Sequence, residues 1–195
     1  MNTLKTDINP RFQLADIRAF TLPSSGASPS AAAAEWKDLG LREDLTRGLL
    51  EGLKLKRPLP SQVSGIPALL KLKTGLFAAP TGCGKTLSYL LPLFQHLKNE
   101  ESDAAFRKEA AAGPRALILV PTHELVRQVY ATAKALSHYT KLRVETIDTA
   151  FKHSSNAVNS LDILISTPRS LLKNQTEAGA GQQKSKKLNR KGLCL

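Results

Sequence analysis

Hydrophobic positions follow a helical spacing in several stretches of the chain. From Trp36 onward, leucines recur at steps of three and four residues up to Leu53, and Pro58 and Pro60 then end the pattern. The helices expected from such spacing cover residues 36–53, 62–72, 85–98 and 123–136. Pro92 falls inside the third of them and should kink that helix or end its regular part.

Short apolar runs separate these helices and have the length of strands. They cover residues 75–79, 116–120, 142–147 and 163–165. The run at 116–120 is continuously apolar, which is typical of a strand buried on both faces. Strands that alternate with helices indicate parallel βαβ units, so the predicted fold class is α/β with a parallel sheet.

Three segments lack this periodicity. Residues 1–34 pass into a Ser/Pro/Ala-rich stretch and are expected to form a flexible arm and linker, with an organelle transit peptide as the alternative. Residues 100–114 are charged and Ala-rich, which predicts a surface excursion. Residues 174–195 are expected to form a basic, disordered tail. One domain, residues 35–173, lies between the arm and the tail.

The charge balance favours a polyanionic partner. With 28 Lys and Arg against 16 Asp and Glu, the formal net charge of the 195-residue chain is +12. The two cysteines, Cys83 and Cys194, suggest no disulfide framework, and no apolar stretch is long enough to span a membrane. An intracellular protein without a membrane partner is therefore expected. Mitochondrion, nucleus and nucleolus all stay open, and no oligomer is predicted.

The octet Ala-Pro-Thr-Gly-Cys-Gly-Lys-Thr has the pattern of a phosphate-binding loop between a strand and a helix. In such loops backbone N–H groups point at nucleotide phosphates, a lysine neutralises the terminal charge, and a Ser or Thr hydroxyl ligates magnesium. Lys85 and Thr86 take the last two roles, which makes Thr86 the predicted metal ligand. Gly82 and Gly84 stand where no Cβ can intrude. The predicted nucleotide contacts in the octet are Ala79, Pro80, Thr81, Gly82, Cys83, Gly84, Lys85 and Thr86.

Gln62 lies ahead of the octet in a loop that Pro58 and Pro60 stiffen. A Gln amide donates to adenine N7 and accepts from adenine N6, so Gln62 is a candidate adenine reader. Trp36 could stack on the base, although a packing role in the core is favoured for it. Together with the octet, these residues predict ATP and Mg²⁺ as cofactors.

Two further motifs directly follow predicted strands. They are Pro121-Thr122-His123-Glu124-Leu125 and Thr167-Pro168-Arg169. In both, a threonine can cap a helix whose N–H groups could hold a phosphate. The carboxyl ends of parallel strands share the edge at which α/β sheets bind ligands, so these motifs are candidate backbone contacts to nucleic acid. The candidate RNA-binding residues are Pro121, Thr122, His123, Glu124, Thr167, Pro168 and Arg169.

The order of these four motifs resembles the Q motif, motif I, motif Ia and motif Ib of DEAD-box RNA helicases. The resemblance covers about residues 35–173, and the stretches that begin at Trp36 and at Lys85 are most similar to mitochondrial members that act on ribosomal RNA. It implies a RecA-like domain that binds ATP and magnesium and grips RNA, as the N-terminal part of an ATP-dependent RNA helicase. Lys85 and Thr86 would then have catalytic roles. Association with ribosomes or other ribonucleoproteins stays open.

The chain departs from the family pattern in its RNA motifs. His123 stands where the family has arginine, which should make one phosphate contact weaker and dependent on pH. Arg169 stands where the family has glycine, and the glycine pair expected between motifs Ia and Ib is absent from residues 146–160. We therefore expect a weaker grip on RNA than is typical of the family.

The acidic motif Asp-Glu-Ala-Asp, which holds magnesium and orients the attacking water, is absent. The acids that follow motif Ia are Glu145, Asp148, Asp162 and Glu177, and none ends an apolar strand as Asp-Glu. We expect a RecA-like domain that is incomplete on its C-terminal side and hydrolyses no appreciable ATP alone. In such a domain the missing strands lie beside the phosphate-loop strand, so backbone would be unpaired in mid-sheet.

Alternatives to the helicase interpretation remain at this level. The tail fits either a basic RNA-binding segment or, as favoured here, the end of an incomplete gene product. A non-hydrolysing nucleotide- or RNA-binding module is the alternative function. A P-loop kinase or GTPase would share the octet, but not Gln62 and its prolines.

Overall fold

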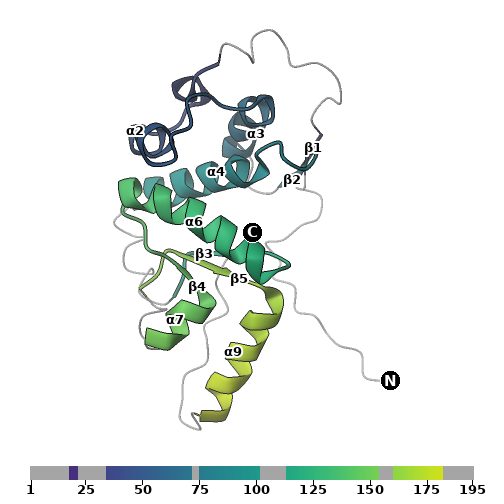
Figure 1. Cartoon of the computed structure of the whole chain (residues 1–195), viewed down its shortest axis with the longest axis vertical. Helices are drawn as coiled ribbons and strands as arrows, with labels where there is room; N and C mark the ends of the chain where they lie inside the picture. Colours follow the sequence, from purple (N-terminus) through teal and green to yellow (C-terminus); the bar gives the residue numbers. More distant parts are fainter. Residues whose placement is uncertain (1–17, 22–33, 72–74, 102–112, 154–159, 182–195) are drawn as a thin grey trace.

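The computed structural model describes residues 18–21, 34–71, 75–101, 113–153 and 160–181. Within these residues, helices alternate with short strands, as the sequence predicts (Figure 1). Most of the expected arm, most of the excursion at 100–114 and the end of the expected tail lie outside the described residues. One strand, β1 (Arg18–Thr21), is formed inside the segment for which a flexible arm is expected.

The region from Trp36 to Leu53 forms three short helices instead of the single predicted helix. They are η2 (Trp36–Leu39), α2 (Glu43–Arg47) and η3 (Gly48–Gly52). Gly40 ends the first of them with a φ of 72°, a left-handed conformation that cannot continue a right-handed helix. The leucine spacing still marks the buried face, because Leu45 and Leu49 are both fully buried.

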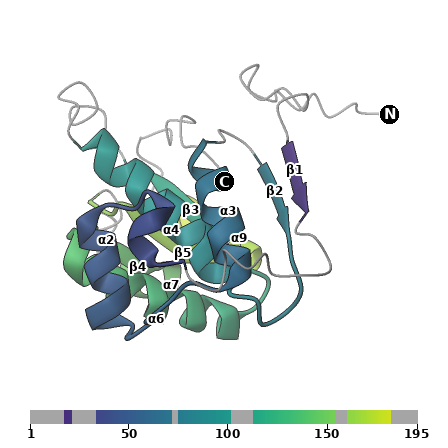
Figure 2. The ribbon, with the colours of Figure 1, turned by 90° about the horizontal axis from the view of Figure 1, so that it is seen from above.

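Two helices flank the strand that leads into the octet. In chain order the three elements are α3 (Pro60–Lys71), β2 (Gly75–Ala78) and α4 (Lys85–Glu100). The two helices pack against each other (Figure 2), and α4 buries an apolar stripe at helical spacing. That stripe comprises Leu87, Leu90, Leu91, Phe94 and Leu97. The helix runs past Pro92 to Glu100, so the proline does not end it.

Among the described residues, three parallel strands form the main sheet, which confirms the predicted α/β class. In spatial order they are β3 (Ala116–Leu119), β5 (Ile163–Ser166) and β4 (Val144–Thr146). Ile163 of β5 is the register partner of Ala116 on one side and of Val144 on the other. The central strand is therefore the last of the described strands in sequence, and it lies between two strands that precede it in the chain.

Helices cover both faces of this sheet. On one face lies α6 (His123–Thr140), and on the other lie α7 (Ile147–His153) and α9 (Pro168–Gly181) (Figure 1). Alternate residues of β5 serve two cores, because Ile163 and Ile165 pack with α4 and α6 while Leu164 packs with Ile147. The strand β3 is less enclosed than predicted, since Leu119 is 41% exposed.

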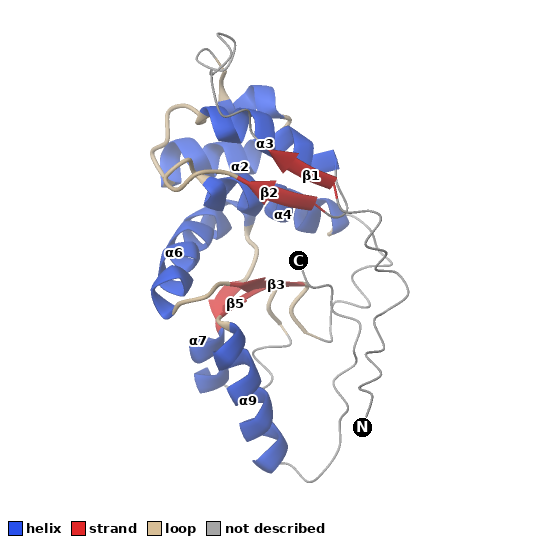
Figure 3. Cartoon of the chain, turned by 90° about the vertical axis from the view of Figure 1, so that its right-hand side faces the viewer, coloured by secondary structure: helices blue, strands red, loops and turns tan. Residues whose placement is uncertain are grey.

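The strand of the octet lies outside the main sheet. It pairs with β1 in a separate two-stranded parallel sheet, in which Gly75 is opposite Arg18. Figure 3 shows this pair beside α3 and α4, apart from β3 and β5. The expectation of unpaired backbone beside the phosphate-loop strand is not met on the side where β1 pairs with β2.

The last described helix, α9, continues past Asn174 to Gly181. It therefore extends into the segment for which a disordered tail is expected. Across the described ranges, we find no helix with both the length and the apolar character needed to cross a membrane.

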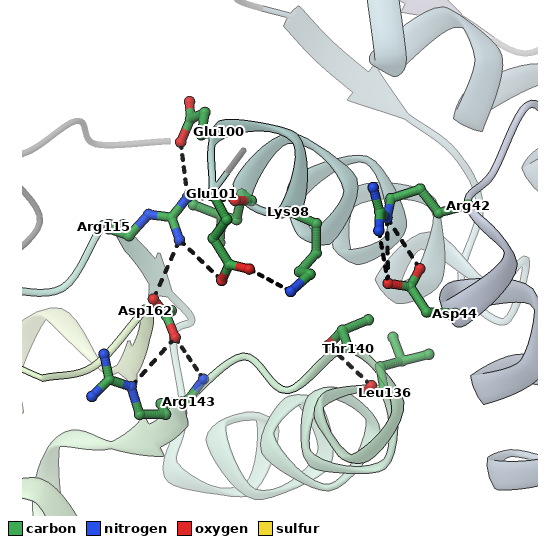
Figure 4. A network of polar contacts seen from close by, with 11 residues as sticks. Arg42, Asp44, Lys98, Glu100, Glu101, Arg115, Leu136, Thr140, Arg143 and Asp162 are labelled. Atoms are coloured by element: carbon green, nitrogen blue, oxygen red, sulfur yellow. Dashed lines mark hydrogen bonds and ion pairs between the residues drawn. The ribbon is translucent and has the colours of Figure 1, made fainter. Parts of the chain in front are cut away.

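A buried cluster of charges joins the amino-terminal ends of the strands (Figure 4). Arg115, just before β3, lies 3.3 Å from Asp162, just before β5, and their side chains are only 7% and 10% exposed. Asp162 also accepts a hydrogen bond of 2.7 Å from the backbone N–H of Arg143. Glu100 and Glu101, at the end of α4, pair with Arg115 as well. The cluster fastens α4 to the edge of the sheet opposite the motifs.

Candidate nucleotide site and nucleic-acid interface

The octet turns sharply between β2 and α4. Gly82 and Gly84 have φ values of 79° and 84°, which cost a residue with a Cβ about 1–2 kcal/mol. A Cβ on Gly84 would also lie 2.4 Å from Gln62 Nε2, whereas a Cβ on Gly82 would meet nothing within 4 Å. Glycine is therefore required at position 84 both by its conformation and by the close approach of α3.

Lys85 and Thr86 begin α4, where unpaired N–H groups and the helix dipole favour an anion. Lys85 Nζ donates to the carbonyl oxygens of Ala79 at 2.8 Å and Pro80 at 2.5 Å, so the side chain folds back over the loop. Thr86 is hydrogen-bonded to the phenol of Tyr89, and burial raises the pKa of Tyr89 although this bond acts in the opposite direction. An ammonium and a hydroxyl thus lie together at the positive end of α4.

Gln62 contacts the octet directly, although it is only 2% exposed. Its Nε2 donates to the Gly84 carbonyl at 3.2 Å, and its Oε1 accepts from the Leu59 N–H at 2.8 Å. Its neighbour Ser61 donates its hydroxyl proton to the carbonyl of Cys83. The structure therefore brings Gln62 and the octet together, while the contact with adenine stays a prediction. Sequence reasoning missed Ser61, whose only signal is a hydroxyl in a first helical turn.

Trp36 lies in the hydrophobic core, where it is 2% exposed. Its indole Nε1 donates to the Leu55 carbonyl at 2.9 Å. A ring buried to this extent has no open face on which a base could stack. The structure therefore supports the packing role of Trp36 and corrects its inclusion among the adenine contacts.

The helices α6 and α9 begin at capped N-termini directly after β3 and β5. Thr122 and Thr167 each accept a hydrogen bond from the backbone N–H three residues later, at 3.2 Å and 3.1 Å. Leu119 at the end of β3 is the register partner of Ser166 at the end of β5. The two helix N-termini therefore lie side by side at the carboxyl edge of the sheet.

Most of the candidate RNA contacts at this edge are exposed. The exposed ones are Pro121, Thr122, His123, Glu124, Pro168 and Arg169. Thr167 is only 4% exposed, so its side chain is not available for direct contact. His123 Nδ1 lies 3.8 Å from Asp148 Oδ2 on α7. An acid therefore neighbours the position at which the family pattern has arginine.

Three of the four acids after motif Ia have partners in the fold. Glu145 accepts from the Tyr130 hydroxyl at 3.1 Å and pairs with Lys134 at 3.0 Å. Partial burial lowers the pKa of Lys134, but the hydrogen bond and charge of Glu145 outweigh it and raise the pKa overall. Asp162 belongs to the charge cluster, and Asp148 faces motif Ia. In the part of the chain that the structure describes, no three His, Cys, Asp or Glu are grouped to hold a metal ion.

Comparisons with known proteins agree with these motifs. A family model described as DEAD/DEAH box helicase matches residues 59–193. DEAD-box ATP-dependent RNA helicase 39 of Arabidopsis thaliana is 33% identical over 145 residues, which cover 73% of this chain and 23% of the relative. The probable ATP-dependent RNA helicase DDX28 of Mus musculus is 40% identical over 142 residues, covering 70% and 26%. The mitochondrial ATP-dependent RNA helicase MRH4 of Eremothecium gossypii is 40% identical over 126 residues, covering 59% and 23%.

Solved structures show the same relationship at the level of the fold. The yeast DEAD-box splicing factor Prp28 matches with a TM-score of 0.58 and 25% identity, over 73% of this chain and 35% of that one. A hypothetical ATP-dependent RNA helicase from Sulfolobus tokodaii matches with a TM-score of 0.55 and 25% identity, over 71% and 37%. The chain spans 23–26% of the length of the three curated relatives. With a RecA-like fold and a match over more than half its residues, the chain belongs to the DEAD/DEAH box helicase family.

Proposed function

We propose that this chain binds ATP with magnesium, and RNA, as the N-terminal part of an ATP-dependent RNA helicase. The observation that carries the proposal is the loop between β2 and α4, in which two left-handed glycines lead the backbone onto the N-terminus of a long helix. A helix N-terminus reached in this way presents N–H donors to phosphate. The relatives described above are named as ATP-dependent RNA helicases, which supports the same activity here.

The residues of the loop fit a magnesium-bound triphosphate. Thr86 supplies the kind of hydroxyl oxygen that Mg²⁺ accepts, and bound magnesium would neutralise charge on the phosphates. Lys85 would exchange its bonds to two neutral carbonyls for bonds to a charged phosphate, which add the attraction between opposite charges. Gln62 now bonds the Gly84 and Leu59 backbone through its amide, and it would exchange these bonds for bonds to the base.

We place the RNA interface at the carboxyl edge of β3 and β5. Two capped helix N-termini lie there, and backbone N–H groups at such termini can hold successive phosphates without reading sequence. The net charge of +12 supports a polyanionic partner. Glu124 and Asp148 bring negative charge to the same edge, which supports the expectation of a weak grip.

Hydrolysis is the part of the family activity that we do not assign to this chain alone. Glu145 and Asp162 are held in ion pairs within the fold, which supports the alternative of a binding module without hydrolysis. The purified, monodisperse chain should bind ATP but release no phosphate above a buffer blank when RNA is added. RNA-stimulated phosphate release would overturn this assignment and support an autonomous ATPase.

Nucleotide binding can be tested by competition against a fluorescent ATP analogue. ATP should compete better than GTP, and Gln62→Ala should remove this preference because the amide reads adenine. Gln95→Ala is the matched control, since Gln95 also bridges backbone groups, at Gly40 and Arg42, but lies on α4 away from the octet. Equal competition by ATP and GTP in the unmodified chain would contradict adenine reading, and no binding of either would overturn the proposal.

RNA binding can be tested by adding charge at motif Ia. His123→Arg should tighten binding of single-stranded RNA and steepen the dependence of log affinity on log salt by about 0.7, the value for one added phosphate contact. His138→Arg is the control, because His138 is also exposed but lies in the last turn of α6. Equal gains for the two variants would show nonspecific attraction and contradict the proposed interface.

A further inference from the structure

Two consecutive residues at the start of α3 hold two consecutive carbonyls of the octet. Ser61 donates its hydroxyl proton to the carbonyl of Cys83, and Gln62 donates its amide proton to the carbonyl of Gly84 at 3.2 Å. Both donors are buried, at 5% and 2% exposure, so they face the loop and not solvent. The contacts link residues that are 22 positions apart in the chain.

The geometry of the peptide bond converts these contacts into a direction for the N–H groups. In a trans peptide the C=O of one residue and the N–H of the next lie in one plane and point in opposite directions. The backbone has no cis peptide bond among the described residues. A Cys83 carbonyl held toward α3 therefore turns the Gly84 N–H away from α3. In the same way, the Gly84 carbonyl is held toward α3 by Gln62, so the Lys85 N–H points away from α3.

These two N–H groups belong to the octet and to the N-terminus of α4, where a phosphate-binding loop offers its donors. We propose that Ser61 is a positioning residue for the nucleotide phosphates: its hydroxyl fixes the Cys83–Gly84 peptide so that the Gly84 N–H faces the phosphate. This inference rests on the proposed nucleotide binding. It extends that function to a side chain that touches neither base nor phosphate.

The effects of Ser61 and Gln62 can be separated, because each side chain holds a different peptide group of the octet. The Gln62 amide is fixed at both ends, because its Oε1 also accepts from the Leu59 N–H at 2.8 Å. The Gly84 carbonyl further accepts from the Ser88 hydroxyl at 3.4 Å, so its direction does not depend on one donor. Removing the Ser61 hydroxyl therefore frees the Cys83–Gly84 peptide and leaves the Gly84–Lys85 peptide held.

The test compares Ser61→Ala and Ser61→Thr in the full 195-residue chain, with titrations of MgATP and of adenosine. Ser61→Ala should weaken MgATP about five-fold, the effect of one hydrogen bond, while adenosine, which has no phosphate, binds as before. Ser61→Thr keeps the hydroxyl and should retain most of the affinity. Ser64→Ala is the matched control, because Ser64 lies exposed on the same helix.

The outcomes separate this inference from the proposed function. If the unmodified chain binds no MgATP, the proposed function fails and the inference with it. If the unmodified chain binds MgATP and Ser61→Ala binds it equally well, the inference alone is overturned. Equal weakening of MgATP and adenosine would also overturn it, because that pattern indicates a merely structural role.

A spectroscopic measurement without ligand completes the test. The amide ¹⁵N chemical shift of Gly84 reports on the hydrogen bond to the Cys83 carbonyl, so it should move in Ser61→Ala and stay in Ser64→Ala. Should Ser61→Ala fail to fold, Ser61→Cys takes its place, because a thiol is a weaker donor of similar size. A smaller change in the Gly84 ¹⁵N chemical shift together with a smaller loss of MgATP affinity would then support the inference. If neither the chemical shift nor the affinity changed, the inference would be overturned.

Discussion

Gly84 shows how a single position can be constrained from two sides. Its φ of 84° is a left-handed conformation that is strained for residues with a Cβ. A Cβ at this position would also meet the buried amide of Gln62. Gly82 has nearly the same φ but open space around it. The pair therefore separates the cost of a left-handed backbone from the cost of a close neighbour.

Alanine substitutions at these two positions should differ in their cost. Gly82→Ala should lower the free energy of unfolding by about 1–2 kcal/mol, the strain of a left-handed alanine. Gly84→Ala should lower it by about 1 kcal/mol more, because the Cβ displaces Gln62 and breaks its bond to the loop. Urea denaturation of the two variants measures the difference. Equal losses would show that the Gln62 amide moves aside freely.

The residues of the site that could be predicted from sequence are those with local patterns. The octet is a contiguous motif, and Thr122 and Thr167 are caps that precede helices, so each can be read within a few residues. Ser61 could not be found in this way, because its partner lies 22 residues further along. Trp36 allowed two roles until its burial in the core decided for packing.

The proposed RNA contacts lie at the capped N-termini of α6 and α9. The two capping threonines, Thr122 and Thr167, differ in their surroundings. Thr122 is exposed, and its hydroxyl accepts one bond from the backbone. Thr167 is 4% exposed, and its hydroxyl also bonds the Ser170 hydroxyl at 3.1 Å. A buried cap that loses its hydroxyl leaves unpaired groups away from water, whereas an exposed cap is replaced by solvent.

The two caps should therefore have different effects on stability. Thr122→Ala should lower the free energy of unfolding by about 1 kcal/mol, and Thr167→Ala by about 2 kcal/mol. Chemical denaturation followed by far-UV circular dichroism measures both, and Thr→Ser at each position is the control because serine also caps. An equal loss at the two positions would indicate that burial of the Thr167 hydroxyl adds nothing.

The ends of helices could be predicted where capping residues or prolines mark them. They could not be predicted where tertiary packing determines whether a helix continues. The start of α9 at Pro168 follows from a capping threonine and a proline suited to the first helical turn. The break at Gly40 was hidden by a continuous leucine spacing, since the periodicity of buried residues survives the turn. The helix α4 continues through Pro92 because packing of its apolar stripe on both sides of the proline outweighs the lost hydrogen bond.

At the scale of the whole molecule, the buried charge cluster connects α4 with all three strands of the main sheet. Asp162 meets both Arg115 and Arg143, which lie before β3 and β4, while it precedes β5 itself. The Arg42–Asp44 pair, also drawn in Figure 4, has side chains that are 41% and 24% exposed and joins residues only two apart. The two pairs contrast a buried link between elements with a local surface pair.

Neutralising the acid in each pair should show this contrast. Asp162→Asn should lower the free energy of unfolding by about 3 kcal/mol, because it removes a charge partner from the buried Arg115. Asp44→Asn should cost less than about 1 kcal/mol, the range of exposed pairs. Urea denaturation at low and moderate salt measures both. A loss at Asp162 no larger than that at Asp44 would contradict a buried structural role for the cluster.

The sequence predicts that the strands are parallel, but it does not predict their order in the sheets. Alternating helices and apolar runs establish parallel strands, yet they do not say that β5 lies between β3 and β4 or that β2 pairs with β1. Pairing between distant strands depends on which edges meet in space. In the described part of the chain, β3 is an edge of the main sheet, and its apolar sequence has no charged residue to deter another strand.

This edge should make the chain self-associate, and a charge on it should reduce association. Leu119→Lys, at a residue that is already 41% exposed, should raise the soluble monomeric fraction measured by sedimentation velocity, because edge lysines oppose strand pairing. Leu50→Lys is the matched control, since Leu50 is 47% exposed but lies in η3, away from any strand. An equal gain for both variants would attribute solubility to added charge in general. A larger gain for Leu119→Lys would locate self-association at β3, where the main sheet ends.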